Sequence, residues 1–202
     1  MSEVEQIEEN LKKLKKLGVS ETEIIKRYES KILSLKNGEL SYVFIKNIKG
    51  ADVKAHGKAI IESKNLKWNY NFAKYVKGAD IKAHGKAVIE SKEPKWNLRF
   101  ASDVKGADKK AHEKVVLESK EPEWNYYFAR DVKGADVMAH GRVIIESKDS
   151  RVNDWFKKDF GDEYKILKEN NDIDEGYNFI DDALDEMIKE NNEENKSMQK
   201  RF

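Results

Sequence analysis

The chain has 202 residues, no cysteine, and 39 basic against 38 acidic side chains. This composition excludes a disulfide framework and a long apolar membrane span, and the charged N-terminus does not resemble a signal peptide, so we expect a cytoplasmic protein. The net charge of +1 hides an asymmetry, because residues 49–148 hold 21 basic and 14 acidic side chains whereas residues 149–202 hold 9 and 16.

The first 37 residues predict two helices. Residues 3–17 show helical hydrophobic spacing, and Gly18 stops the pattern. Ser20 and Glu23 have the spacing of a capping box, which opens a second helix that runs to about Lys36. We assign residues 1–37 to an N-terminal helical cap.

Residues 38–160 form an array with a strict period of 28 residues. The first two complete units, 50–77 and 78–105, are identical at 20 of 28 positions. Phe44 lies one period before Phe72, so half a unit precedes the first complete one. A fixed period of this length, in units too small to close a core alone, is typical of a solenoid.

Each unit predicts two short helices. Asp52 can cap the first helix, in which Ala55, His56 and Ala59 share one face. The second helix carries Trp68 and Phe72 one turn apart, and we expect both columns in the core. The glycine of each "VKGAD" segment is predicted to stop this helix.

Residues 161–202 predict an acidic C-terminal cap of one short and one longer helix. The longer one carries an apolar stripe, which we expect to cover the exposed end of the array: Ile173, Tyr177, Ile180, Leu184 and Met187. The predicted fold is therefore an all-α solenoid of αα-hairpins, about four and a half repeats long, with helical caps at both ends.

The repeated unit, with its "FA", "DVKGAD" and "IESK" segments, resembles a degenerate 28-residue helical repeat found in uncharacterised proteins of low-GC bacteria and their phages. The resemblance covers about 120 of the 202 residues, and its motifs are structural. It implies no enzymatic activity and no cofactor. Those repeats commonly carry leucine where this chain carries histidine. The architecture also resembles HEAT-like solenoids, whose period is longer.

Four histidines recur at the same position of the unit: His56, His84, His112 and His140. A catalytic set of Asp52, His56 and Ser63 is excluded by distance. Seven residues of helix separate His56 from Ser63, which is about 10 Å and far beyond hydrogen-bond reach. Shared metal binding fails because neighbouring layers stand about 8–10 Å apart. We expect a stacked column of half-buried imidazoles that bond to aspartate or backbone groups, and an asparagine column that bonds across layers.

The outward face of the second helix varies between units, whereas the rest of the unit stays nearly constant. It mixes aromatic and basic side chains, which suit both protein anchors and nucleic-acid contacts. The candidate partner-binding residues are Lys67, Tyr70, Lys74, Lys95, Arg99, Tyr126, Tyr127, Arg130, Trp155 and Lys158.

These patterns predict a non-enzymatic scaffold that binds a partner protein through this face. The resemblance to phage repeats suggests an inhibitor of a host defence protein. The alternative is binding of nucleic acid or a nucleotide by the basic array, including the lysine ladder of the first helices: Lys54, Lys58, Lys82, Lys86, Lys110 and Lys114. The basic array and the acidic tail could also pair two copies of the chain. No metal site and no membrane contact are expected.

Overall fold

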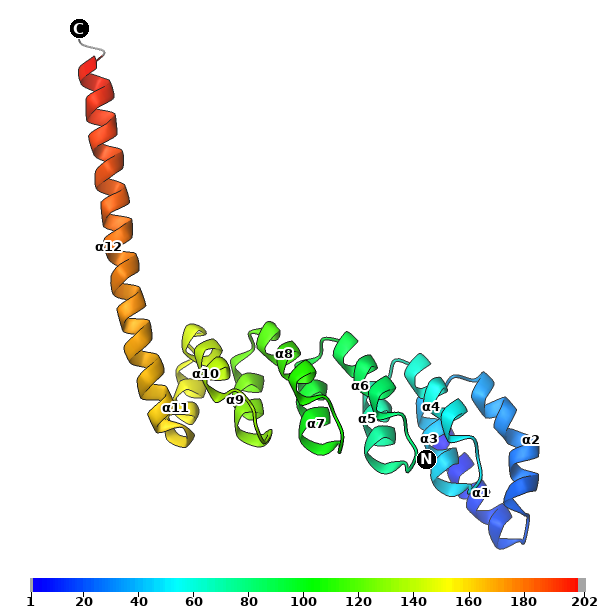
Figure 1. Ribbon diagram of the computed structural model, residues 1–202. Coiled ribbons are helices and arrows are strands. Elements are labelled where there is room, and N and C mark those ends of the chain that lie inside the picture. The colour runs from blue at the N-terminus through cyan, green and yellow to red at the C-terminus, as the bar shows by residue number, and fades with distance from the viewer. Residues whose placement is uncertain (1, 200–202) are drawn as a thin grey trace.

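A computed structural model describes residues 2–199, with the side chains of residues 173–177 and 190–199 left out of the description. Within this range the fold is all-α, and neighbouring helices pair in succession as an αα-hairpin solenoid, as predicted (Figure 1). The helices are α1 (Glu3–Lys16), α2 (Glu21–Ser34), α3 (Gly38–Asn47), α4 (Val53–Glu62), α5 (Leu66–Tyr75), α6 (Ile81–Glu90), α7 (Pro94–Asp103), α8 (Lys109–Ser119), α9 (Pro122–Asp131), α10 (Val137–Glu146), α11 (Ser150–Asp159) and α12 (Gly161–Gln199).

The helices form two parallel rows, which alternate along the chain. Helices α3, α5, α7, α9 and α11 contact one another in order and form the odd row. Helices α4, α6, α8 and α10 form the even row in the same way, above the odd row in Figure 1. Each layer of the solenoid therefore holds one helix of each row, and each helix packs on the layers before and after it.

The cap helices continue these rows. Helix α1 contacts α3 of the odd row, and α2 contacts α4 of the even row. The sequence register agrees, because Lys36 and Asn37 after α2 stand one period before Lys64 and Asn65 after α4. The repeat pattern thus begins within the predicted N-terminal cap.

Caps set the helix starts as the sequence predicts. In the even row, Asp52 Oδ1 accepts a hydrogen bond from the Ala55 N–H at 2.9 Å, and the equivalent aspartates do the same. In the odd row, Pro94 and Pro122 are the first residues of α7 and α9, where a missing N–H costs nothing.

The glycine of the "VKGAD" segment does not end the odd-row helix, contrary to the prediction. Helix α5 ends at Tyr75, and Val76 is already extended. The Ala79 N–H then bonds to the Val76 carbonyl at 3.2 Å, which closes a turn with Gly78 at φ +88°. This φ favours glycine, so Gly78 shapes the connection to the next layer.

The core is a column of buried rings and branched side chains between the two rows. One phenylalanine from each odd-row helix is fully buried: Phe44, Phe72, Phe100, Phe128 and Phe156. Each even-row helix lays Ile60 or its equivalent against this column, fully buried. The tryptophans are only half-buried, but Trp96, Trp124 and Trp155 pack against this core from the surface of the odd row, so the prediction that they belong to the core was partly right.

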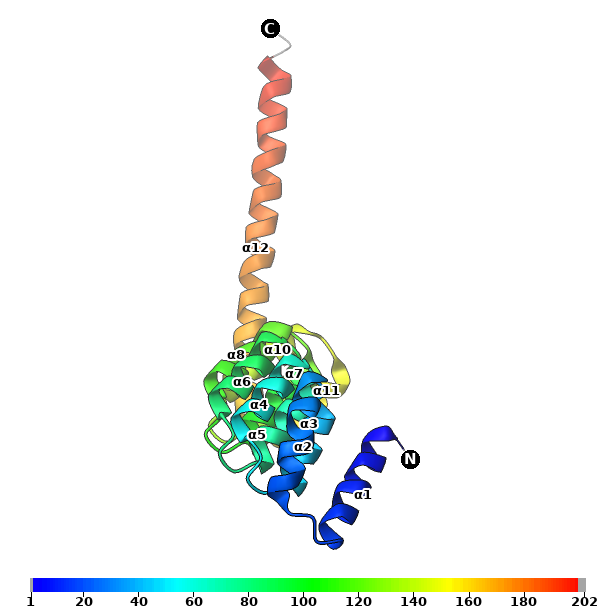
Figure 2. The same cartoon turned by 90° about the vertical axis from the view of Figure 1, so that its right-hand side faces the viewer.

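The C-terminal region is one continuous helix rather than a short and a longer one. No proline interrupts residues 161–199, and the polar stretch near Asn171 does not break the helix. Only the start of α12 contacts α10 and α11, where Leu167 is buried. The rest projects away from the array (Figures 1 and 2).

The apolar stripe of α12 therefore does not cover the array, contrary to the prediction. Ile180, Leu184 and Met187 are between 50% and 61% exposed, and Phe179 is 76% exposed. The stripe residues Ile173 and Tyr177 lie outside the described side chains. The end of the solenoid core is closed by Leu167 and Tyr164 instead.

Candidate functional site

A ladder of asparagine–histidine hydrogen bonds links consecutive layers. Asn97 on α7 lies 2.7 Å, Oδ1 to Nδ1, from His112 on α8, which stands 15 residues later in the chain. His84 and His140 make the same contact with Asn69 and Asn125 at 2.8 and 2.7 Å. The expected cross-layer role of the asparagine column is confirmed. The histidines are fully buried rather than half-buried, and their partner is asparagine rather than aspartate.

The asparagine amide fixes which ring nitrogen carries the proton. Asn97 Nδ2 donates to the Val88 carbonyl at 3.1 Å and to the Glu93 carbonyl at 2.9 Å, so Oδ1 must face the histidine. An oxygen accepts, and His112 Nδ1–H therefore donates. Burial lowers the pKa of His84 and His112 to about 4, so both rings are neutral at pH 7, with a lone pair on Nε2.

The first layer lacks this bond. The position of the asparagine is taken by Ser41, whose hydroxyl has no hydrogen-bond partner among the described residues. Neither ring nitrogen of His56 has a hydrogen-bond partner in this part of the chain either. Serine is too short to reach the imidazole, so the ladder begins only with the Asn69–His84 bond.

Two glutamates approach the other nitrogen of the ring. Glu29 Oε1 lies 3.5 Å from His56 Nε2, and Glu113 Oε1 lies 3.4 Å from His140 Nε2. Burial lowers the pKa of both histidines, and the glutamates oppose this shift. Each glutamate also accepts a backbone N–H, from Asp52 at 2.7 Å or from Asp136 at 2.6 Å. Within the described residues, no cluster of His, Cys, Asp or Glu could hold a metal ion.

The predicted partner face divides into buried and exposed members. Tyr70 and Tyr126 are buried between layers, so the expectation that they face outward was wrong. The Tyr70 hydroxyl donates to Asp103 and accepts from Lys74 Nζ at 2.7 Å, and the Tyr126 hydroxyl donates to Asp159 at 2.6 Å. Both tyrosines therefore connect one odd-row helix to the next and are not available to a partner.

The exposed members combine with the tryptophans into a row of cations over aromatic rings. Each odd-row helix from α5 to α11 holds at least one such pair, with a cation-to-centroid distance between 4.7 and 5.4 Å. The pairs are Lys67 over Trp68, Arg99 over Trp96, Arg130 over Tyr127 and Arg151 over Trp155. We call these eight residues the aromatic–cation strip.

Near the C-terminal end of the strip, aromatic rings lie close to one another within and between helices. The rings of Trp124 and Tyr127 lie 6.1 Å apart, and those of Tyr127 and Trp155 lie 6.3 Å apart across two layers. Lys95 and Lys158 are exposed on the same helices, and Lys74 is half-buried in its contact with Asp103. All ten predicted residues therefore lie on odd-row helices, where eight are exposed or half-buried and the two tyrosines Tyr70 and Tyr126 are buried.

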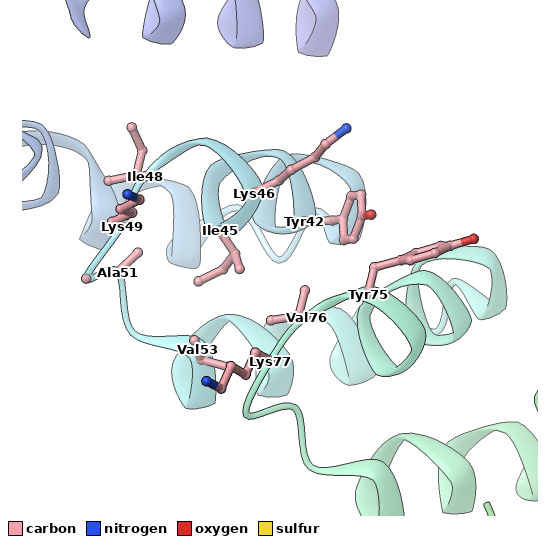
Figure 3. A pocket seen from close by; sticks show the side chains of 11 residues that line it. Tyr42, Ile45, Lys46, Ile48, Lys49, Ala51, Val53, Tyr75, Val76 and Lys77 are labelled. Atoms are coloured by element: carbon pink, nitrogen blue, oxygen red, sulfur yellow. The ribbon is translucent and has the colours of Figure 1, made fainter. Parts of the chain in front are cut away.

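A groove of about 860 Å³ between α3 and α5 was missed by the sequence analysis. Figure 3 shows Tyr42 and Tyr75 at one end and Ile45 and Val76 near its middle, with lysines around the rim. Tyr42 and Lys46 stand one period before Tyr70 and Lys74, which both bond to Asp103. The position equivalent to Asp103 is Tyr75 in this layer, so Tyr42 and Lys46 have no aspartate beside them. Comparison of position 75 with its equivalents would have revealed the exception.

The lysine ladder of the even row is partly neutralised. Three of its lysines pair with the glutamate one turn later: Lys58 with Glu62, Lys86 with Glu90, and Lys114 with Glu118, at 3.7 to 3.9 Å. Such exposed pairs contribute only tenths of a kcal/mol to stability. They nevertheless reduce the positive charge offered to a polyanion.

No family model, no curated protein and no solved structure matches the chain. Over the described residues, no helix combines the length and the apolarity that a membrane crossing requires.

Proposed function

We propose that the protein is a non-catalytic scaffold that binds a partner protein through the aromatic–cation strip. The observation that carries this proposal is the recurrence of a cation over a ring on four consecutive odd-row helices. Tryptophan, tyrosine and arginine dominate the energetic centres of protein interfaces, and rings that are already held by neighbours lose little entropy on binding. Inhibition of a host defence protein by a phage-encoded chain is the biological role that the repeat resemblance suggests.

The competing function is binding of nucleic acid by the even row. It is less well supported, because three lysines of the ladder already pair with glutamates and because the surplus of basic residues over residues 49–148 is modest. The two functions use opposite rows of the solenoid. Variants confined to one row therefore separate them.

Site-specific photo-crosslinking in cells is the test we propose. A crosslinking residue at position 127 or 155 of the odd row should capture one protein reproducibly, whereas one at position 86 of the even row should not. Arg130→Ala, in the same cells, should reduce the crosslink from position 155 by ~tenfold, as expected for loss of an interface anchor. Lys58→Ala, on the even row, is the matched control and should leave it unchanged.

The opposite pattern would overturn the proposal. Capture from position 86 only, or a nucleic-acid shift that disappears between ~50 and ~200 mM salt and depends on Lys82 and Lys86, would favour the even row. Crosslinks between two copies of the chain would identify self-association as the role of the strip.

A further inference from the structure

A groove between α6 and α8 lies where the chain omits a side chain that it carries in other layers. Its volume is about 430 Å³, and its lining includes Gly85, Lys82 and Lys86 of α6, Asp108 before α8, and His112. His112 is 0% exposed, and its Nε2 has no hydrogen-bond partner among the described residues. A Cβ atom on Gly85 would lie 3.6 Å from this Nε2, so the nitrogen faces the missing side chain.

Two other layers carry a glutamate at the equivalent position, and both place its carboxylate in the same way. Glu113 accepts the Asp136 N–H at 2.6 Å and lies 3.4 Å from His140 Nε2. Glu29 accepts the Asp52 N–H at 2.7 Å and lies 3.5 Å from His56 Nε2. In both layers the carboxylate thus bonds to the backbone N–H before an even-row helix and lies beside the histidine Nε2, which marks a position that a carboxylate can occupy.

We propose that the groove beside Gly85 binds a carboxylate ligand, seated between the backbone N–H of Asp108 and Nε2 of His112. Within the described residues, this N–H has no partner, in contrast to the N–H of Asp52 and Asp136. Lys82 at the rim supplies positive charge, which attracts an acidic ligand, whereas Lys86 beside it is paired with Glu90 at 3.7 Å. The seat belongs to the even row, so it is separate from the proposed partner strip.

A carboxylate in this seat requires a second proton on the His112 ring, at Nε2. Nδ1–H of His112 already donates to Asn97, so the neutral ring presents a lone pair at Nε2. A carboxylate repels a lone pair, and the contact becomes favourable only when Nε2 carries a proton, taken from solvent or brought by the acid. Binding therefore converts Nε2 of His112 to an N–H, next to Lys82, Lys86 and Asp108.

The test is a titration of the full chain with ¹⁵N-labelled histidines, followed by NMR. The probes are free glutamate, a short glutamate peptide and the matched glutamine peptide. We expect the glutamate probes to move His112 Nε2, saturably, toward the position of a protonated nitrogen. His56 and His140 should not respond, because Glu29 and Glu113 already occupy their seats. Tighter binding of the peptide or of free glutamate identifies the natural source of the carboxylate.

Two variants sharpen the test. Gly85→Glu should fill the groove with an internal carboxylate and weaken the His112 response by ~tenfold or more. Glu113→Gly should open the equivalent seat, so that His140 begins to respond; this variant removes a side chain and introduces no crowding. An equal response to the glutamine peptide, a uniform shift of all four histidines, or no shift of His112 would overturn the proposal.

Discussion

The junction between α7 and α8, where two successive repeat units meet, and the first such junction, between α3 and α4, share the same backbone plan but differ in one polar contact. Asn97 bonds to two carbonyls and to His112, whereas Ser41 and His56 at the equivalent positions have no such bonds. Both bury a histidine and a phenylalanine at equivalent positions: His112 and Phe100 in one, His56 and Phe44 in the other. The comparison shows that apolar packing suffices to stack a layer, and that the asparagine determines whether its buried polar groups are satisfied.

The largest expected effect is loss of stability in acid, in the layers where the ladder is complete. The unfolded chain takes up protons on histidine near pH 6.5, whereas the folded His84 and His112 resist protonation down to about pH 4. Stability is therefore full above pH 6.5 and falls as pH decreases toward 4, by about 3 kcal/mol for each histidine. Denaturant unfolding at several pH values measures this slope. A flat profile between pH 7 and 5 would contradict neutral buried rings.

The next largest effect is expected from Asn97→Ala. The change removes two bonds to carbonyls and leaves His112 Nδ1 buried without an acceptor, so the free energy of unfolding should fall by about 3 kcal/mol. Ser41→Ala is the matched control in the first layer. It removes an unpartnered buried hydroxyl and should be neutral or slightly stabilising. Equal losses in the two variants would mean that the asparagine acts by volume alone.

Replacement of histidine by the leucine of the similar repeats should have opposite effects in the two layers. His84→Leu leaves Asn69 Oδ1 without its donor and should destabilise the fold by about 1–2 kcal/mol. His56→Leu removes a buried ring whose nitrogens make no hydrogen bond among the described residues, although Nε2 lies 3.5 Å from Glu29, and should be neutral or stabilising. Thermal and denaturant unfolding of the two variants, side by side, gives the comparison. Stabilisation by His84→Leu would show that the ladder bond contributes nothing net.

The smallest expected effect is a repair of the first layer. Ser41→Asn places an amide where Asn69 and Asn97 stand one and two periods later, within reach of His56 Nδ1. We expect a gain of about 1 kcal/mol in the free energy of unfolding, typical of one buried hydrogen bond. Combined with His56→Leu, the gain should disappear. A loss of stability from Ser41→Asn alone would show that the first layer has no room for the amide.

The sequence predicted the array well because the same caps, turns and core positions recur in each 28-residue unit. The aspartate caps, the prolines at the first helical position and the cross-layer asparagines all follow from spacing within one unit. The period did not reveal which face Tyr70 and Tyr126 occupy, since a tyrosine on a helix surface can equally bridge to the next layer. The period also says nothing about α12, which lies outside the repeat. No further layer packs against the described part of α12 beyond its start, so its apolar stripe stays exposed.

The candidate sites were only partly predictable for the same reason. Arg99, Tyr127, Arg130 and Trp155 stood out because they vary where the rest of the unit is constant, and all four belong to the strip. The carboxylate seat depends on contacts between layers. Glu29, Gly85 and Glu113 share a column, but only their distances to the next histidine and the next backbone N–H show what the glutamates do.

The central claim is that His84, His112 and His140 are structural links, each tied through Nδ1 to the preceding layer. A double-mutant cycle with Asn97→Ala and His112→Leu tests it most directly, because it isolates the interaction between the two side chains. We predict a coupling of about 1–2 kcal/mol in this layer and none in the matched cycle with Ser41→Ala and His56→Leu. Additive effects at Asn97 and His112, or equal coupling in both layers, would contradict the account.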